Sequence, residues 1–207
     1  MNEEEQYFHP NLPLHSLQVL QDFLNHYRQA GAKFISLPWI VDENFSQATN
    51  PHPKNPDRLF LNKPLVSSGE QSFCQLASQG KLKNDMLYVG WTPCFRSEEV
   101  FDPTHHHYFL KAEAFRFVPQ HQEEDYLNAI LSLAQHVFDK ELSRRGVAQS
   151  TTIVYLPKLE QFDILLNGIE LGSYGIRKHP TLPQNYLFAT VVAEPRFSLA
   201  VFKCLNP

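Results

Sequence analysis

The chain has 207 residues, of which 43% are hydrophobic and 19% charged, and its formal net charge is −4. These values predict one globular domain over 1–207, with 1–13 as an N-terminal extension, and exclude a disordered chain. No apolar run approaches the roughly 20 residues that span a bilayer, and the acidic start MNEEEQ is unlike a signal peptide. The acidic balance disfavours a protein that binds nucleic acid mainly through its phosphates.

The three cysteines are an odd number with no CxxC spacing, which indicates neither a disulfide framework nor a zinc site. We therefore expect a reducing, cytoplasmic compartment. Cys74 lies among apolar neighbours and is expected in the core.

The first half of the chain opens with an amphipathic pattern. Leucine and aromatic residues recur at helical spacing over 14–30, and Gly31 follows as a stop, so we expect a helix there. A stretch rich in Asn, Pro and Asp predicts a long loop, and such loops are often functional. In chain order we expect a strand over 33–37, that loop over 42–63, a short helix over 70–79 and strands over 86–98 and 108–118.

The second half opens with a longer amphipathic helix over 122–145, ended by Gly146. Asn167-Gly168 lies between two apolar runs, which predicts a two-residue hairpin turn. Hairpin strands with a few helices indicate an α+β domain on a mainly antiparallel β-sheet flanked by helices. The remaining expected elements are strands over 151–155, 162–166, 169–176 and 186–192 and a closing helix over 196–205.

Charged residues in the two strands before the long helix form a first candidate site. Alternation places Arg96 and Glu98 on one side of their strand, and Phe109, Lys111 and Glu113 on one side of the next. If those sides coincide, an arginine able to bind two phosphate oxygens meets an aromatic ring and carboxylates. The alternative is a solvated sheet face with salt bridges.

The predicted hairpin supplies a second candidate. Its turn pairs Leu165 with Glu170 and Asp163 with Gly172, so these four residues project from one face. Two carboxylates beside the space left by a glycine could hold Mg²⁺, which prefers a few carboxylates plus substrate phosphates. The alternative is a surface hairpin whose acidic residues serve solubility.

Two weaker candidates remain. Glu194-Pro195-Arg196 opens the last predicted helix, where unpaired backbone N–H groups and an arginine could make an anion site. A surface arginine is the alternative there. The run His105-His106-His107 points in alternate directions and is more simply a polar loop than a metal site.

Taken in order, these segments resemble the three signature motifs of the class II aminoacyl-tRNA synthetases. Phe34-Ile35-Ser36-Leu37-Pro38 resembles motif 1, Phe95–Glu98 with Phe109–Glu113 resembles motif 2, and Thr190–Phe197 resembles motif 3. Ser68-Gly69-Glu70 is similar to the family's Thr/Ser-x-Glu signal. The segment 162–177 is similar to aspartyl/asparaginyl-type enzymes and to ammonia-dependent asparagine synthetase, and the resemblance runs from about residue 14 to the end.

The resemblance implies a class II synthetase/biotin ligase-like core that uses ATP and Mg²⁺ to activate an amino acid as its adenylate. It implies an acidic, aspartate-like substrate, an acceptor that is ammonia, a small molecule, a carrier or a tRNA end, and a homodimer formed through motif 1. A stand-alone core without an anticodon-binding domain is expected, which disfavours full tRNA charging. The resemblance implies that Arg96, Glu170 and Arg196 act in catalysis and bind ATP together with Glu98 and Phe109. It implies that the amino acid is bound by Glu70, Lys111, Glu113 and Arg177, and the metal by Asp163 and Glu170.

One segment departs from the family pattern. Motif 3 normally carries glycines that let the backbone approach ATP, whereas this chain has Ala189-Thr190-Val191-Val192-Ala193. Side chains there could crowd the nucleotide. The alternative to an enzyme is therefore a non-catalytic synthetase relative that acts as a binding or regulatory module.

Overall fold

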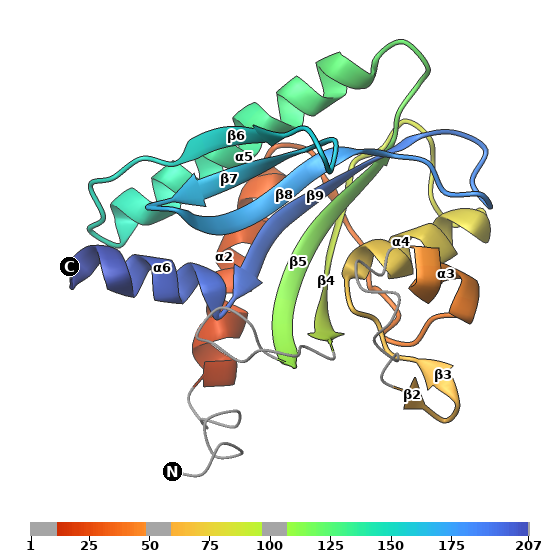
Figure 1. Ribbon diagram of the computed structural model, residues 1–207, viewed down its shortest axis with the longest axis horizontal. Coiled ribbons are helices and arrows are strands. Elements are labelled where there is room, and N and C mark those ends of the chain that lie inside the picture. The colour runs from red at the N-terminus through yellow and green to blue at the C-terminus, as the bar shows by residue number, and fades with distance from the viewer. Residues whose placement is uncertain (1–11, 49–58, 97–106, 207) are drawn as a thin grey trace.

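The computed structural model describes residues 12–48, 59–96 and 107–206. Its centre is a seven-stranded sheet in the order β1-β4-β5-β9-β8-β7-β6 (Figure 1). Only the β1–β4 pair is parallel, so the expected mainly antiparallel α+β architecture is confirmed. The strands are β1 (Lys33–Phe34), β4 (Tyr88–Phe95), β5 (Tyr108–Phe117), β6 (Thr152–Leu156), β7 (Gln161–Leu166), β8 (Ile169–Arg177) and β9 (Tyr186–Glu194).

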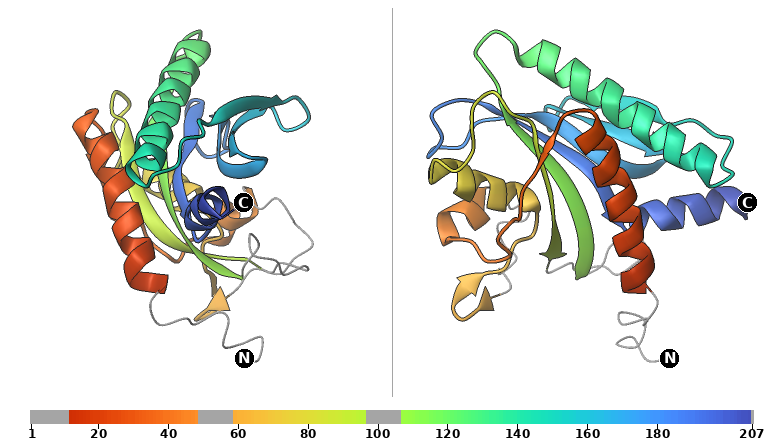
Figure 2. Two further views of the ribbon diagram at one scale, coloured as in Figure 1. Left: turned by 90° about the vertical axis from the view of Figure 1, so that its left-hand side faces the viewer. Right: turned by 180° about the vertical axis from the view of Figure 1, so that it is seen from behind.

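The helices lie on both faces of this sheet (Figure 2). On the first face pack α2 (Leu12–Gln29), α5 (Glu123–Arg144) and α6 (Arg196–Leu205), and their apolar sides meet in a large core. Phe23, Phe138 and Phe197 bring those three helices together, with ring centroids 4.9–6.0 Å apart. We call this the helix face of the sheet.

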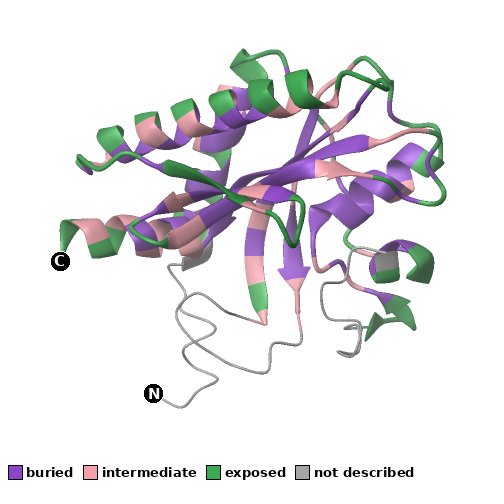
Figure 3. Ribbon diagram, turned by 45° about the horizontal axis from the view of Figure 1, so that its top comes forward, coloured by how far each residue is buried: buried purple, intermediate pink, exposed green. Residues whose placement is uncertain are grey.

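The opposite face carries a smaller core under α4 (Gly69–Ser78) and α3 (Glu43–Ala48). Phe115 stacks there between Phe73 of α4 and Tyr186 of β9, with centroids 5.5 and 5.0 Å away. The α4 helix covers only part of this side, and we call it the α4 face. Buried residues fill the central strands, whereas exposed residues gather on the outer helix surfaces and on β6 (Figure 3).

The sequence located most elements correctly, but two expectations near the N-terminus were wrong. The stretch expected to be a loop contains α3, because Phe45 is buried and the amide of Asp42 donates to Gln75 Oε1 of α4 at 2.8 Å. It also holds β2 (Leu59–Phe60), which pairs with β3 (Lys63–Pro64). The strand expected over 33–37 is only two residues long, and the next element of the chain is α3.

None of the helices in the described ranges combines the length and apolar character needed to cross a bilayer.

Candidate active site

Arg96 directly follows β4, and its side chain lies over the neighbouring strand β5. Its guanidinium carbon is 5.0 Å from the centroid of the Phe109 ring, and its Nε donates to the carbonyl of Ser67 at 3.2 Å. The Arg96 amide donates to the His107 carbonyl at 2.9 Å, which extends the β4–β5 pairing. The sides of the two strands that carry Arg96 and Phe109 therefore coincide on the α4 face, while Glu98 lies outside the described residues.

Two more charged residues of β5 follow on the same face. Lys111 Nζ lies 2.7 Å from Glu113 Oε1, and both side chains are largely buried. The same carboxylate accepts hydrogen bonds from Ser68 Oγ at 2.7 Å and from the Gly69 amide. Glu113 thus joins β5 to the beginning of α4.

The buried carboxylate of Glu70 lies near this point, on the first turn of α4. It accepts from Arg177 Nη1 of β8 at 2.7 Å and from the hydroxyl of Tyr186 at 2.8 Å. The Arg177 guanidinium carbon lies 3.8 Å from the Phe188 ring centroid, and Arg177 Nη2 is 3.4 Å from Gln161 Oε1. The structure therefore brings together Glu70 and Arg177, which are 107 positions apart in the chain.

The hairpin carboxylates also reach the α4 face. Ser173 Oγ donates to Glu170 Oε1 at 3.1 Å, and Gln161 Nε2 donates to Asp163 Oδ1 at 3.1 Å. Arg196 Nη1, at the start of α6, lies 3.0 Å from Glu170 Oε1. Burial, and then the charge of Glu170, raise the pKa of Asp163, so these two carboxylates repel each other.

The hairpin register differs from the predicted one beyond the second pair. A bulge places Asp163 opposite Ser173, and Ile164 opposite Gly172, because β8 has one residue more than β7 at this point. The expected open space beside the carboxylates is absent, since a Cβ on Gly172 would lie 2.9 Å from Thr190 Cβ. Gly172 therefore does not belong to the Asp163–Glu170 surface.

A second bulge, between β5 and β9, determines on which face of the sheet the side chains of the motif 3-like segment lie. In β9 the register shifts so that Thr190 pairs with Glu113 and Val192 pairs with Ala112. Val191 and Val192 are both buried in the core of the helix face. The larger residues of this run are thus turned away from the surface that carries Arg96, which the sequence did not reveal.

The Glu194-Pro195-Arg196 segment also differs from expectation. Glu194 is buried, and its carboxylate accepts from the Ser198 amide at 3.1 Å and from Ser16 Oγ of α2 at 3.2 Å. One N–H of the α6 start is therefore occupied by the protein itself, and no open anion site is formed by it. Burial raises the pKa of Glu194 to about 7, although the hydrogen bonds from Ser198 and Ser16 act in the opposite direction.

Sequence reasoning missed several residues of this surface. Ser173, Gln161, Tyr186 and Phe188 each contact a predicted site residue, yet their positions resemble ordinary strand and core positions. Alternation from Asp163 and Arg177 could have identified Gln161 and Ser173. Tyr186 and Phe188 could not be identified in this way, because their contacts with Glu70 and Arg177 depend on the order of the strands in the sheet.

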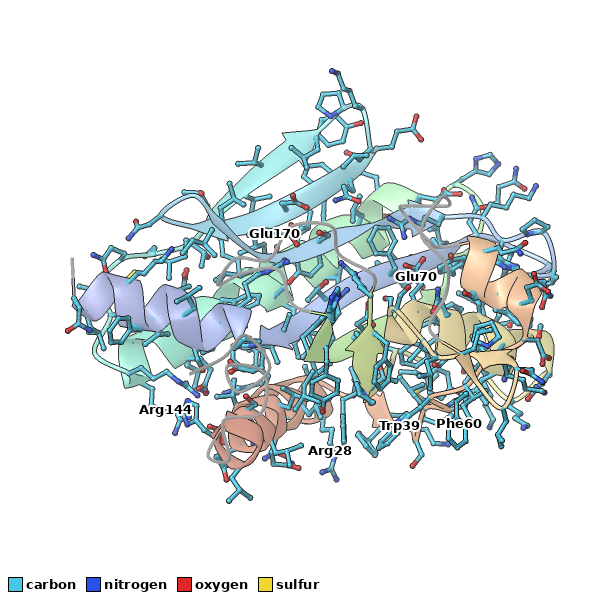
Figure 4. The ribbon with its side chains drawn as sticks, turned by 60° about the horizontal axis from the view of Figure 1, so that its bottom comes forward. Arg28, Trp39, Phe60, Glu70, Arg144 and Glu170 are labelled. Carbon is cyan, nitrogen blue, oxygen red and sulfur yellow. The ribbon has the colours of Figure 1, made fainter. Side chains whose placement is uncertain are left out.

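Figure 4 shows Glu70 and Glu170 over the sheet, well separated from Arg28, Trp39 and Phe60 at another border of the molecule. Four cations and four carboxylates thus share the α4 face. They are Arg96, Lys111, Arg177, Arg196, Glu70, Glu113, Asp163 and Glu170.

Comparison with solved structures identifies the architecture. A pyrrolysyl-tRNA synthetase from Desulfitobacterium hafniense aligns over 91% of this chain and 70% of its own, with a TM-score of 0.68 and 13% identity. Seryl-tRNA synthetase from Pyrococcus horikoshii, complexed with ATP, aligns over 93% of this chain with a TM-score of 0.73 and 16% identity. Cytoplasmic serine-tRNA ligase from Naegleria fowleri, in complex with AMP, aligns over 97% with a TM-score of 0.71 and 15% identity.

The fold is that of a class II aminoacyl-tRNA synthetase catalytic core. The chain spans about half the length of the two seryl enzymes, 51% and 52%. No family model matches the sequence, and no curated protein matches it significantly. At such low identities the similarity establishes the class II core as a fold, while the chemistry has to be argued from the residues on the α4 face.

Proposed function

We propose that this protein uses ATP to activate an amino acid as an aminoacyl-adenylate on the α4 face. The observation that carries the proposal is the gathering of four cations and four carboxylates, from separate strands and helices, on that one face of a synthetase fold. The solved relatives with ATP and AMP support a nucleotide as one ligand.

In the proposed reaction, a carboxylate oxygen of the amino acid attacks the α-phosphorus of ATP. A new oxygen–phosphorus bond forms as the bond to the leaving pyrophosphate breaks, so no protein nucleophile is needed. Positioning and electrostatic stabilisation carry such a step. Arg96 suits the α-phosphate, Phe109 suits the adenine ring, and Arg196 suits the terminal phosphates; Glu98 is assigned to ATP on the resemblance alone.

The hairpin carboxylates fit a magnesium ion that completes its coordination with substrate phosphates and water. Asp163 and Glu170 lie close enough that the charge of Glu170 raises the pKa of Asp163, and a divalent cation would relieve that repulsion. The described residues contain no group of three or more metal-ligating side chains, so a magnesium ion here would need phosphate and water oxygens as further ligands. Bound there, Mg²⁺ would supply charge neutralisation to the phosphates.

The Glu70–Arg177 pair argues for an acidic substrate. An amino acid with a side-chain carboxylate can place its ammonium on Glu70 and its carboxylate on Arg177, so both charges keep a partner. The ammonium of a neutral amino acid would take Glu70 from Arg177 and offer Arg177 no carboxylate in its place, so charge pairing at this site favours an acidic substrate. The acceptor of the activated amino acid is proposed to be ammonia, a small molecule, a carrier or a tRNA end.

The test is amino-acid-dependent exchange of pyrophosphate into ATP, run with each of the twenty amino acids. We expect exchange with aspartate or glutamate, and at least about a 100-fold loss in Arg96→Ala and in Glu170→Ala. Lys203→Ala removes an exposed cation of α6 and serves as the control. Absence of both exchange and ATP binding would favour the alternative, a non-catalytic relative with a binding or regulatory role.

We also propose a homodimer through the motif 1-like segment. Large apolar side chains are exposed in this segment and beyond it: Phe34 is 42%, Trp39 49% and Phe60 53% accessible. A groove of about 770 Å³ lies at Phe34, between α2 and β1, and is lined by Asn25, Arg28, Gln29, Ala32, Lys33 and Phe34. Clustered exposed aromatic residues are typical of protein interfaces.

A further inference from the structure

The carboxylate of Glu113 is enclosed by donors from the protein. Lys111 Nζ and Ser68 Oγ each lie 2.7 Å from its Oε1, and the Gly69 amide donates to its Oε2. Its side chain is only 5% exposed. Both oxygens of Glu113 are therefore engaged by neighbouring residues.

Two of those donors belong to the beginning of α4. Ser68 is the N-cap residue of this helix, and Gly69 is its first residue. The first N–H groups of a helix lack partners within the helix and carry partial positive charge, so a carboxylate there is favourable. The packing is also close, because a Cβ on Gly69 would lie 2.8 Å from Glu113 Oε2. Glu113 thus fixes where α4 begins relative to β5.

Glu70 follows immediately in the same helical turn, and its surroundings differ. Its carboxylate contacts only side chains of the strands across the site, Arg177 at 2.7 Å and Tyr186 at 2.8 Å, among the described hydrogen bonds. Its position relative to those strands depends on the placement of the α4 start.

We infer that Glu113 is a positioning residue, which anchors the beginning of α4 to β5 and thereby places the carboxylate of Glu70. It acts through Glu70 instead of contacting the amino acid itself. The role of Glu70 toward the substrate rests on the proposed function, whereas the anchoring of α4 does not.

The anchoring is tested in the ligand-free protein by hydrogen exchange of single amides. Glu113→Gln replaces a charged acceptor by a neutral one, so we expect protection of the Gly69 amide to fall about tenfold. Amides of β9 report any change in global stability. The control Asp139→Asn removes the carboxylate that accepts from the Thr151 amide at 2.8 Å and should leave Gly69 unchanged. Unchanged Gly69 protection in Glu113→Gln would overturn the inference.

Kinetics then distinguish positioning from direct contact. Glu113→Gln should raise KM for the amino acid about tenfold with KM for ATP unchanged, and Gly69→Ala, which crowds the same carboxylate, should do likewise. In the double variant Glu70→Gln/Glu113→Gln, the loss should equal that of Glu70→Gln alone. Additive losses would overturn the inference by showing that Glu113 contacts the substrate. If the wild-type protein shows no pyrophosphate exchange, the proposed function is contradicted. Hydrogen exchange of the Gly69 amide would still test whether Glu113 anchors α4.

Discussion

At the scale of single residues, the α4 face is a set of charges that are already matched with one another. Glu70 pairs with Arg177, Glu113 with Lys111, and Glu170 with Arg196. A matched set can accept a zwitterionic substrate with limited net cost, because each new contact replaces an existing one. This is the physical reason to expect selection by charge pattern at this site.

Glu194 gives a prediction that depends on pH. Burial raises its pKa from 4.5 to about 7, so the folded protein holds a proton that the unfolded chain has lost. The stabilising contribution of the neutral carboxyl is complete below about pH 4.5 and is lost as pH rises through about 7. A shift of this size corresponds to about 3 kcal/mol.

Glu194→Gln keeps an uncharged polar side chain that cannot ionise. Relative to the wild type, its free energy of unfolding should therefore rise by about 3 kcal/mol between pH 4.5 and pH 8. Urea unfolding of both proteins across that range gives the difference directly, and other titrating groups cancel in the comparison. Parallel pH curves for the two proteins would contradict the prediction.

At the scale of elements, two bulges decide which side chains reach the site. The bulge in the β7–β8 hairpin places Ser173 opposite Asp163, and the one between β5 and β9 turns Val191 and Val192 to the helix face. Alternation predicts faces correctly only within an uninterrupted ladder, because one inserted residue reverses every later side chain.

Gly172 tests the close packing of β8 against β9. In Gly172→Ala the new methyl group would lie 2.9 Å from Thr190 Cβ and 3.0 Å from the Tyr174 hydroxyl, between two central strands. We expect a loss of about 1–3 kcal/mol in the free energy of unfolding, measured by chemical denaturation. Thr152→Ala, at an exposed position of β6, should change it by less than about 0.5 kcal/mol. Equal stability of the two variants would count against the close β8–β9 packing.

At the scale of the whole molecule, the proposed dimer interface includes Trp39 and Phe60, which lie apart from Glu70 and Glu170 (Figure 4). Phe60→Glu introduces a charge on the exposed aromatic border and should weaken self-association about 30-fold or more. Phe202→Glu makes the same change on α6, where the side chain is 62% exposed, and should leave association unchanged. Sedimentation velocity over a range of concentrations measures both, and a monomeric wild type would refute the proposed interface.

The sequence by itself determined the class of fold and most of its elements. The helices over 69–78, 123–144 and 196–205 and the hairpin at Asn167-Gly168 lie within a few residues of their predicted positions. Local signals suffice there, since amphipathic periods, terminal glycines and turn residues act over neighbouring positions. The ordered motifs around Arg96, Glu70 and Glu170 also indicated which side chains to examine.

Only the tertiary structure decided how those side chains combine. The pairing of Glu70 with Arg177 joins residues 107 positions apart, and Glu113 meets Ser68 across 45 positions. The α3 helix in the expected loop depends on burial of Phe45 in the core of the α4 face, and the two bulges depend on register between strands. Contacts of this kind follow from strand order and packing, which no local pattern in the sequence encodes.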